Sequence, residues 1–582
     1  MTNEYRTSQS STSSQLVIKQ EENERQVASP MPPLASKEPN KDRGEVPEYV
    51  SGMRLYVILI NITLVLFLIM VDQTIVVTVN QPPPRDFPLL ISNRRFLELQ
   101  THSTLLRTLA ESSVNAPPLR AAMQPLYGKI YQYYASKQTF LTALAIFELG
   151  SLVSALAKSS AMLIIGRAVS GLGGSGLITG LLSILAASAP LEQRPKYLGF
   201  MMGVASLGLV LGPVLGGLLT QHASWRWCFW LNLPIGGITG TALSLIHIPD
   251  SKLISTTRAT LKEQVQRLDL PGFVLFSPAT IMLLLALNWG GVEYSWSSPT
   301  IIGLFCGFAG ACIVFLIWEF RQGKKAMIPL DMLKNPVMIS ASLVCVFSQG
   351  SLFLVTYYLP IWFQAVKDVN PTMGGVYYLP SVGSQVVGSM LSGALTSRLG
   401  YPTPFAIVGC ALAAIASGLL STLQPSSSTG IWVGYQLISG FSRGMAAQQP
   451  LTAIQAIIHR DQIPIGNSWL MFCQLLGSSV CVSLGQTIFS SQLSVALKQF
   501  APEVDAAAVF AVGATSFRTV VTPAQVPSVV KAYSQAITTV FYLGIGASSM
   551  GFVTSWGMGW NSLKPKKVNE ETASEPVGDA KV

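Results

Sequence analysis

Three ionisable side chains lie inside otherwise apolar stretches of the sequence: Asp72, Glu148 and Arg167. Ionisable groups at membrane depth are costly to bury, so each one is by default a functional hypothesis. An Asp–Arg pair would keep both groups charged, and a proton arriving on Asp72 would release Arg167. The chemistry that these residues suggest is therefore a switch driven by protonation.

The expected depth of these residues supports a pairing. Counted from the expected outer ends of their helices at about 1.5 Å per residue, Asp72 and Arg167 differ by less than one helical turn. The alternative interpretation is a purely structural ion pair that locks two helices together. Glu148 is expected near mid-depth, either as a second proton carrier or as a hydrogen-bonded or protonated interhelical contact.

A second group of polar side chains lies in the apolar runs of the C-terminal half. Amides, aromatic rings and one arginine together suit a cavity for bulky, amphipathic or neutral organic ligands. For any one of these residues, interhelical hydrogen bonding or anchoring at the membrane interface is the alternative. The candidate cavity residues are Gln349, Tyr357, Trp362, Gln364, Gln436, Arg443, Gln448, Gln449 and Gln474.

Small residues recur at every fourth position in two segments. Such spacing forms a helix face that a second backbone can approach closely. In the first segment, 208–217, a proline within the run is expected to kink the helix; its key residues are Gly208, Gly212, Pro213, Gly216 and Gly217. The second, GLGGSG at 171–176, has neither the preceding strand nor the Gly-Lys-Ser/Thr of a phosphate loop, so we interpret it as a packing face.

The composition shows what must position these side chains. Of 582 residues, 49% are hydrophobic and 11% are charged, against about 25% charged residues in ordinary soluble domains. A soluble enzyme is thereby excluded, and the net charge of +10 lies between the apolar runs rather than in a nucleic-acid-binding patch. The seven cysteines lack CxxC spacing, and neither an ATP-binding nor a HExxH motif occurs. We therefore expect no enzymatic activity, metal or cofactor, and a proton gradient as the energy source.

Thirteen apolar runs are long enough to cross a bilayer, which takes about 20 helical residues. Lys and Arg cluster in alternate connections, as expected for loops that face the cytoplasm. The alternation fails once, because the regions of Arg54 and Lys129 both belong inside while one clear run separates them. A further crossing is therefore needed between residues 80 and 127, which makes fourteen.

The segment 80–121 is poorly suited to be that crossing. It contains five arginines, and a central Arg costs about 2.5–3.5 kcal/mol on insertion scales. Either this is a genuine extracellular excursion with a poor helix, or the translated sequence is faulty here. We favour the fault. The predicted fold is an all-α integral membrane protein with fourteen membrane helices, of which the second is aberrant.

The predicted organisation has five parts. A disordered cytoplasmic tail covers 1–53, and an N-terminal six-helix bundle covers 54–248. A cytoplasmic linker with two inserted helices occupies 249–336. A C-terminal six-helix bundle follows at 337–560, and a second cytoplasmic tail at 561–582.

Several motifs then identify a family. VDQTIVVTV (71–79), LIIGRAVSGLGGSG (163–176), GLVLGPVLGG (208–217) and GMAAQQPLTAIQ (444–455) occur in this order. They resemble the major facilitator superfamily, in particular its fourteen-spanner fungal drug:proton antiporters, a branch that includes toxin-efflux pumps of secondary-metabolite clusters. The resemblance covers about residues 54–560 apart from 80–121.

The resemblance implies roles for several residues. Asp72 matches the acidic position of helix 1, Arg167 the arginine of helix 4 that is tied to proton coupling, and the 208–217 glycines and proline the antiporter motif. Gly128, Lys129 and Lys137 belong to the gating loop after helix 2, which here lacks the acidic residue seen in many members of the superfamily.

The expected function is a proton-coupled antiporter that exports a small organic compound by alternating access. Its partners would be the substrate, protons and the lipid bilayer, without nucleic acid, and we expect a monomer in the plasma membrane or, alternatively, the vacuolar membrane. One alternative is a facilitator or importer of a nutrient with the same fold. Another is a non-transporting receptor or scaffold, if the aberrant helix 2 is genuine.

Overall fold

The structure is a computed structural model that describes residues 49–79, 117–248, 267–291 and 294–564. Within these ranges the secondary structure is helical, apart from one isolated bridge between Gly290 and Tyr294. The expected all-α fold is therefore observed. Most of both predicted tails and residues 80–116 of the aberrant segment lie outside the described residues.

The N-terminal half comprises helices that pack in neighbouring pairs. Helix α6 packs against α7, α2 against α8, and α10 against both α2 and α6. Ser159 begins α7, where its hydroxyl accepts a hydrogen bond from the Met162 amide at 3.2 Å. The helices are α2 (Met53–Val79), α5 (Pro117–Tyr133), α6 (Ser136–Ala155), α7 (Ser160–Ser188), α8 (Arg194–His222), α9 (Trp227–Trp230) and α10 (Asn232–Leu245).

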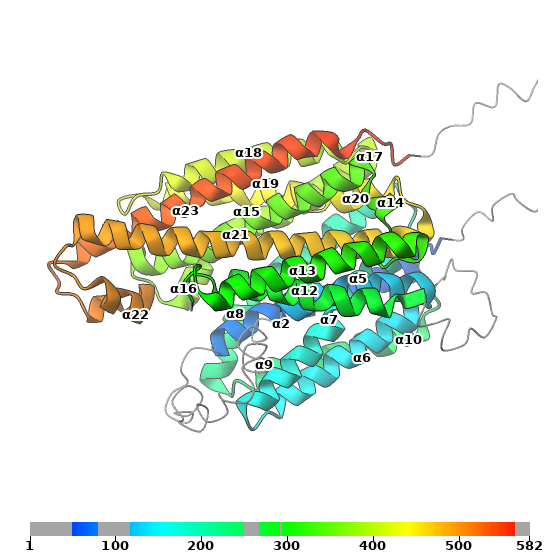
Figure 1. The fold of residues 1–582 in the computed structure, drawn as a ribbon, viewed down its shortest axis with the longest axis horizontal. Coiled ribbons are helices and arrows are strands. Elements are labelled where there is room, and N and C mark those ends of the chain that lie inside the picture. The colour runs from blue at the N-terminus through cyan, green and yellow to red at the C-terminus, as the bar shows by residue number, and fades with distance from the viewer. Residues whose placement is uncertain (1–48, 80–116, 249–266, 292–293, 565–582) are drawn as a thin grey trace, which may run out of the picture. The chain divides into compact units, whose positions relative to one another are not determined.

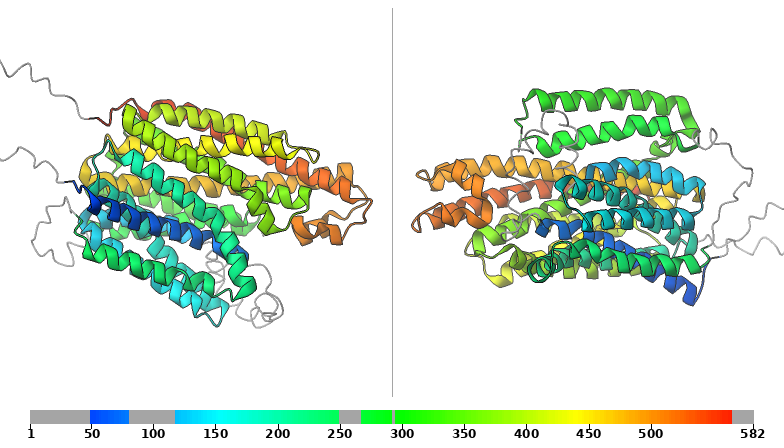
Figure 2. Two further views of the ribbon diagram at one scale, coloured as in Figure 1. Left: turned by 180° about the vertical axis from the view of Figure 1, so that it is seen from behind. Right: turned by 90° about the horizontal axis from the view of Figure 1, so that it is seen from below.

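Two long helices and a short one follow, α12 (Leu270–Trp289), α13 (Pro299–Gln322) and α14 (Leu330–Leu333). Helix α12 packs against α13, α5 and α21, whereas α13 keeps most of its surface free of protein contact. Figure 2 shows α12 and α13 in green, lying together along one side of the other helices. They are the expected inserted pair.

The C-terminal half repeats the pattern of long helices broken by short ones. Helix α17 packs against α19, and α23 packs against both α15 and α18. Asn335 begins α15, accepting a hydrogen bond from the Val337 amide at 3.0 Å. The helices are α15 (Pro336–Lys367), α16 (Pro371–Tyr377), α17 (Leu379–Leu399), α18 (Thr403–Ser421), α19 (Thr429–Ala447), α20 (Gln449–Gln455), α21 (Ile463–Phe500), α22 (Ala506–Ser516) and α23 (Val526–Ser555).

Eleven helical segments among the described residues are long and apolar enough to cross a membrane. The sequence predicts fourteen, and the three expected crossings outside this set are α5, α17 and α19. Helix α5 has 17 residues and contains Arg120 and Lys129. Helices α17 and α19 are rich in Gly, Ser and amides, and most of these polar groups lie buried against neighbouring helices.

The two halves meet along two helix pairs, α8 with α17 and α5 with α21. Gly393 of α17 leaves room for α8, because a Cβ there would lie 2.4 Å from the Pro195 carbonyl oxygen. Where α8 begins and α17 ends, the Arg194 Nη1 atom donates to Gln455 Oε1 at 3.3 Å, and Ser397 Oγ donates to the Glu192 carbonyl at 2.5 Å. These contacts lie at the end of the helices where the basic connections place the cytoplasm (Figure 1).

Candidate functional site

The structure brings Asp72 and Arg167 into direct contact. Arg167 Nη1 on α7 lies 2.7 Å from Asp72 Oδ1 and 2.8 Å from Oδ2 on α2. Both side chains are only 5% exposed. A charge-assisted contact of this length is strong, and it joins two helices that are far apart in the sequence.

Asn232 completes this pair, and the sequence reasoning missed it. Its Nδ2 atom donates to Asp72 Oδ1 at 3.1 Å and to Ser151 Oγ at 3.0 Å, so α10 connects α2 with α6. The Phe229 ring lies 5.7 Å from the Arg167 guanidinium carbon and covers it. The available signal was a single amide at the break between α9 and α10, inside the apolar run 225–248.

Glu148 lies one helical turn before Ser151 on α6 and is half-buried. Neither of its carboxyl oxygens has a hydrogen-bond partner among the described residues. Its side chain occupies the space beside Gly236 of α10, where a Cβ would overlap Glu148 Oε1. The carboxyl group is therefore buried between α6 and α10, the helices that carry the hydrogen-bonded pair Ser151 and Asn232.

The glycine motif of α8 packs against α2 at the level of Asp72. A Cβ on Gly208 would lie 3.0 Å from the Phe67 carbonyl oxygen, and one on Gly212 would overlap the Thr74 hydroxyl. Pro213, Gly216 and Gly217 also belong to α8. Gly216 is buried, and Gly217 lies beside Thr372. The predicted close approach of a second backbone is thus found at Gly208 and Gly212.

The expected gating loop is mostly helix. Gly128 and Lys129 lie inside α5, which continues to Tyr133 because no glycine or proline interrupts residues 129–133. A Cβ on Gly128 would overlap the Ser468 hydroxyl of α21, so this residue permits the contact between the two halves. The role of Gly128 and Lys129 in a gate stays a prediction.

Lys129 is 1% exposed, and its acidic neighbours come from the inserted helices. It lies within electrostatic range of Asp269, at the start of α12, and of Glu319 on α13. The missing acidic residue of the loop is thereby replaced from another part of the chain. Lys137 has a different task, since its Nζ atom donates to the Ser244 and Ile246 carbonyls at 2.7 and 2.8 Å and closes the end of α10.

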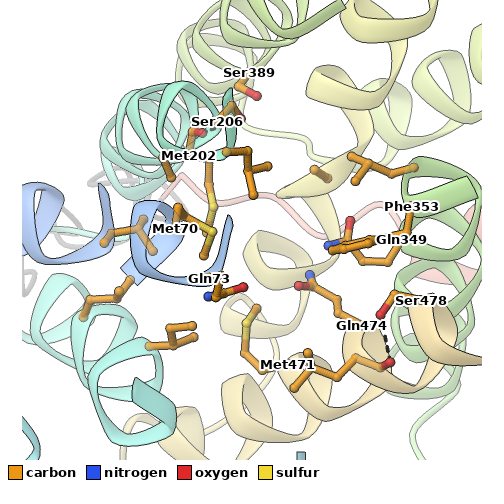
Figure 3. A pocket seen from close by; sticks show the side chains of 18 of the residues that line it. Met70, Gln73, Met202, Ser206, Gln349, Phe353, Ser389, Met471, Gln474 and Ser478 are labelled. Atoms are coloured by element: carbon orange, nitrogen blue, oxygen red, sulfur yellow. Dashed lines mark hydrogen bonds between the residues drawn. The ribbon is translucent and has the colours of Figure 1, made fainter. Parts of the chain in front are cut away.

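A cavity of about 160 Å³ lies between the two halves. Met70 and Gln73, the neighbours of Asp72 on α2, line it together with one methionine and three amides from the opposite half. Figure 3 shows Gln73 and Gln474 extending toward each other across the cavity, with Gln349 beside them. The other polar or sulfur-containing lining residues are Arg120, Gln124, Met202, Ser206, Gln385, Ser389, Met471 and Ser478.

Gln349 and Gln474 are the predicted cavity residues that line this space, and Arg443 borders a small side pocket next to it. The structure corrects the placement of three others. Tyr357 is 50% exposed on the outer surface of α15, Trp362 donates to Ser534 Oγ at 3.1 Å within the core, and Gln364 packs beside Gly374. All three lie further along α15, and its later turns leave the cavity.

Gln436, Gln448 and Gln449 also lie away from the central cavity. Gln436 Nε2 donates to the Tyr377 carbonyl at 3.0 Å, and Gln448 Nε2 to the Ser389 carbonyl at 2.9 Å. Gln449 Oε1 accepts a hydrogen bond from Thr396 at 3.1 Å. Each amide links α19 or α20 to a neighbouring helix, the alternative noted from the sequence.

The comparison with known proteins now decides the family. The profile of the Major Facilitator Superfamily matches residues 118–482. The chain belongs to this superfamily. The chain is 41% identical to the MFS-type transporter pigP of Monascus ruber, over 92% of this chain and 90% of that protein. It is 42% identical to the efflux pump mlcE of Penicillium citrinum, over 92% and 94%, respectively.

Solved structures agree on the fold. The proton:xylose symporter XylE superposes with a TM-score of 0.55 at 14% identity, covering 88% of this chain and 97% of that chain. The human organic anion transporter MFSD10 superposes with a TM-score of 0.51 at 13% identity, covering 84% and 99%. The superfamily and all-α membrane fold predicted from the sequence are thus confirmed. This is a multi-pass membrane transporter of small molecules and not an enzyme.

Proposed function

We propose that this protein exports a small organic compound across the plasma membrane in exchange for protons, and that it works as a monomer. The observation that carries the proposal is the buried Asp72–Arg167 pair, whose acidic member stands between two residues, Met70 and Gln73, that line the central cavity. Protonation of Asp72 would remove the charge that holds Arg167 and would act directly on the helix that contacts substrate.

The packing suggests how this change reaches the other half. Helix α2 lies against α8 through Gly208 and Gly212, and α8 packs against α17 of the C-terminal half. A shift of α2 after protonation would move α8 and loosen the contacts at the cytoplasmic end. Rocking of the two halves about the cavity then exposes it to one side at a time.

Relatives named efflux pumps support the outward direction. XylE, which shares the fold alone, is named a symporter, so the direction of coupling needs its own test. Inside-out vesicles from cells that express this chain would be loaded with a pH-sensitive dye and given an acidic interior. A panel of fluorescent organic compounds would then be added, with vesicles from cells that lack the chain as the control.

Proton exchange predicts that at least one compound accumulates inside these vesicles while the interior becomes less acidic. Accumulation should stop when an ionophore collapses the pH difference. Uptake that ignores the gradient excludes proton coupling, and compound and protons leaving the vesicles together would indicate symport. If no compound moves under any gradient, the alternative of a non-transporting receptor or scaffold would be favoured.

A further inference from the structure

Arg443 of α19 is a buried cation without a counter-charge. It is 5% exposed, and its guanidinium contacts neutral groups. Nη1 donates to the Ser439 carbonyl at 3.1 Å and to its hydroxyl, and Nη2 lies 3.4 Å from Ser417 Oγ and 3.5 Å from the Ser351 carbonyl and hydroxyl oxygens. Its Nε atom has no hydrogen-bond partner among the described residues.

The sequence of this half explains the missing counter-charge. Between residues 337 and 560 there are four acidic residues, Asp368, Asp461, Glu503 and Asp505, and each lies in a connection or in the short 3-10 turn before α21. The buried arginine of the N-terminal half is different, because Arg167 is neutralised by Asp72. An arginine in a membrane interior normally pairs with an acid or with backbone carbonyls, and it often marks a substrate or ion pathway.

A small pocket adjoins Arg443 and borders the central cavity. It has a volume of about 10 Å³ and shares Gln349, Leu352 and Ala447 with the cavity. Such a volume holds about one water-sized group, such as a single oxygen atom. Ser548, whose hydroxyl donates to Ser351 at 2.7 Å, lines the far side. Because the Ser548 proton is already donated to Ser351, the charged donor that the pocket offers to one oxygen of a molecule in the cavity is the Arg443 guanidinium.

The lining of the central cavity, like the side pocket at Arg443, carries a positive charge and no negative one among the described residues. Among its described residues Arg120 is charged and no acidic side chain is present. A cationic ligand would find no partner there, whereas an anion would find one arginine in the cavity and a second in the side pocket. Methionines and leucines on the remaining surface suit an apolar body.

We propose that Arg443 is the specificity-determining residue for an organic acid, and that its pocket receives one oxygen of the substrate carboxylate. This inference rests on the proposed export function, whose substrate class it names. The carboxylate completes the charge balance that the C-terminal half lacks. The carboxylate oxygen lies in the side pocket while the apolar body of the acid stays in the central cavity.

The test is a binding measurement that needs no gradient. The purified full chain in lipid nanodiscs would be titrated with radiolabelled 1-naphthaleneacetate and with its methyl ester, which differ mainly in charge. We expect the wild-type protein to bind the acid at least tenfold more tightly than the ester. Arg443→Gln should remove this preference with little effect on the ester, and Arg398→Gln, an exposed arginine of α17, should leave it intact.

Two more measurements distinguish the charge of Arg443 from its geometry, and a carboxylate from an inorganic anion. Arg443→Lys keeps the charge but loses the guanidinium geometry, so a reduced preference for the acid over the ester should persist. If Arg443→Gln does not fold, Arg443→Lys takes its place in the test. Replacing sodium chloride by sucrose at equal osmolarity should leave acid binding unchanged or stronger. A strict requirement for chloride would show that the pocket holds an inorganic anion, and the proposal would then be wrong.

The proposal is overturned if the wild-type chain does not bind the acid more tightly than the ester, or if folded Arg443→Gln keeps the preference. Because binding is measured without a pH difference, this result is independent of proton coupling. If the chain prefers the acid but shows no proton-driven export, the inference stands and the antiport mechanism is refuted. If it shows proton-driven export but no preference for the acid, only the inference is refuted.

Discussion

Asp72 is held by donors from two different helices, the Arg167 guanidinium of α7 and the Asn232 amide of α10. A carboxylate that accepts from both donors fixes three helices in one arrangement. Removing the charge is therefore expected to have two separable effects, one on coupling and one on stability.

We predict that Asp72→Asn abolishes proton-coupled export while the protein still reaches the membrane. The amide cannot take up a proton, and it leaves Arg167 as an unpaired buried charge, which costs about 3–5 kcal/mol. Vesicle transport and thermal unfolding of the purified variant measure the two effects. The double variant Asp72→Asn with Arg167→Gln should regain much of the thermal stability but no coupling, whereas retained export in the single variant would reduce Asp72 to a packing role.

At the scale of helices, the contact between α2 and α8 depends on the absence of side chains. Gly212 approaches Thr74 and the Val71 carbonyl so closely that a methyl group would overlap the threonine hydroxyl. Real Cβ atoms do not occupy such positions, so a larger residue must push the helices apart.

Gly212→Ala should therefore lower both thermal stability and transport, with a destabilisation of about 1–3 kcal/mol from overpacking. Gly237→Ala in α10 is the matched control, because nothing lies within 4 Å of its Cβ position among the described residues. Unfolding curves and vesicle uptake for both variants provide the measurement. Equal behaviour of the two would show that the α2–α8 contact is not tight.

The inserted pair is attached by a buried acidic residue. Asp269, in a left-handed conformation with φ of 48°, accepts hydrogen bonds from Gly272 N at 3.2 Å, Trp318 Nε1 at 2.8 Å and Met327 N at 2.9 Å. It thus caps α12 and ties it to α13 and to the connection that follows. Lys129 of α5 lies within electrostatic range of this carboxylate.

Asp269→Ala should destabilise the protein by about 2–4 kcal/mol, since it removes a helix cap and leaves buried donors without an acceptor. Asp331→Ala is the control in the same insert, because that carboxylate is 79% exposed and pairs only with Lys334. Denaturation of both purified variants would be compared. A small loss for Asp269→Ala, equal to that of the control, would contradict the anchoring role.

At the scale of the whole molecule, the two halves touch near the end of the helices that the basic connections assign to the cytoplasm. Ser397 of α17 touches the connection before α8 at Glu192, and Gln385 Nε2 donates to Ser206 Oγ at 3.1 Å further along the same helix pair. Alternating access requires these contacts to break once in each cycle.

Cysteines at positions 192 and 397, joined by a short cleavable thiol reagent, should therefore stop transport, and cleavage should restore it. Each single-cysteine variant, treated identically, controls for the seven native cysteines, five of which are buried. Vesicle uptake before and after cleavage is the readout. Full activity of the cross-linked protein would mean that this end does not open.

Residues 80–121 affect the whole molecule as well, because they should contain the second membrane crossing. We predict that sequencing the transcript reveals a mainly apolar stretch of about 20 residues in this place. An arginine-rich coding sequence confirmed in the transcript would refute it.

The sequence by itself determined the membrane fold, the superfamily and the two charged residues Asp72 and Arg167. The membrane fold and the charged residues follow from apolar run length, basic connections and the cost of burying a charge, whereas the superfamily follows from the resemblance of several short motifs; all of these are local properties of the chain. The glycines of α8 were predictable for the same reason, since their spacing defines a face of one helix.

Only the tertiary structure decided which polar residues meet. Asn232 binds Asp72 because the break between α9 and α10 directs its amide inward, and Lys129 comes within electrostatic range of Asp269 because α12 packs beside α5. Trp362 and Gln448 looked like ligands and proved to be links between helices. A buried amide satisfies its hydrogen bonds with whichever neighbour the packing provides, and that neighbour is not determined by local sequence.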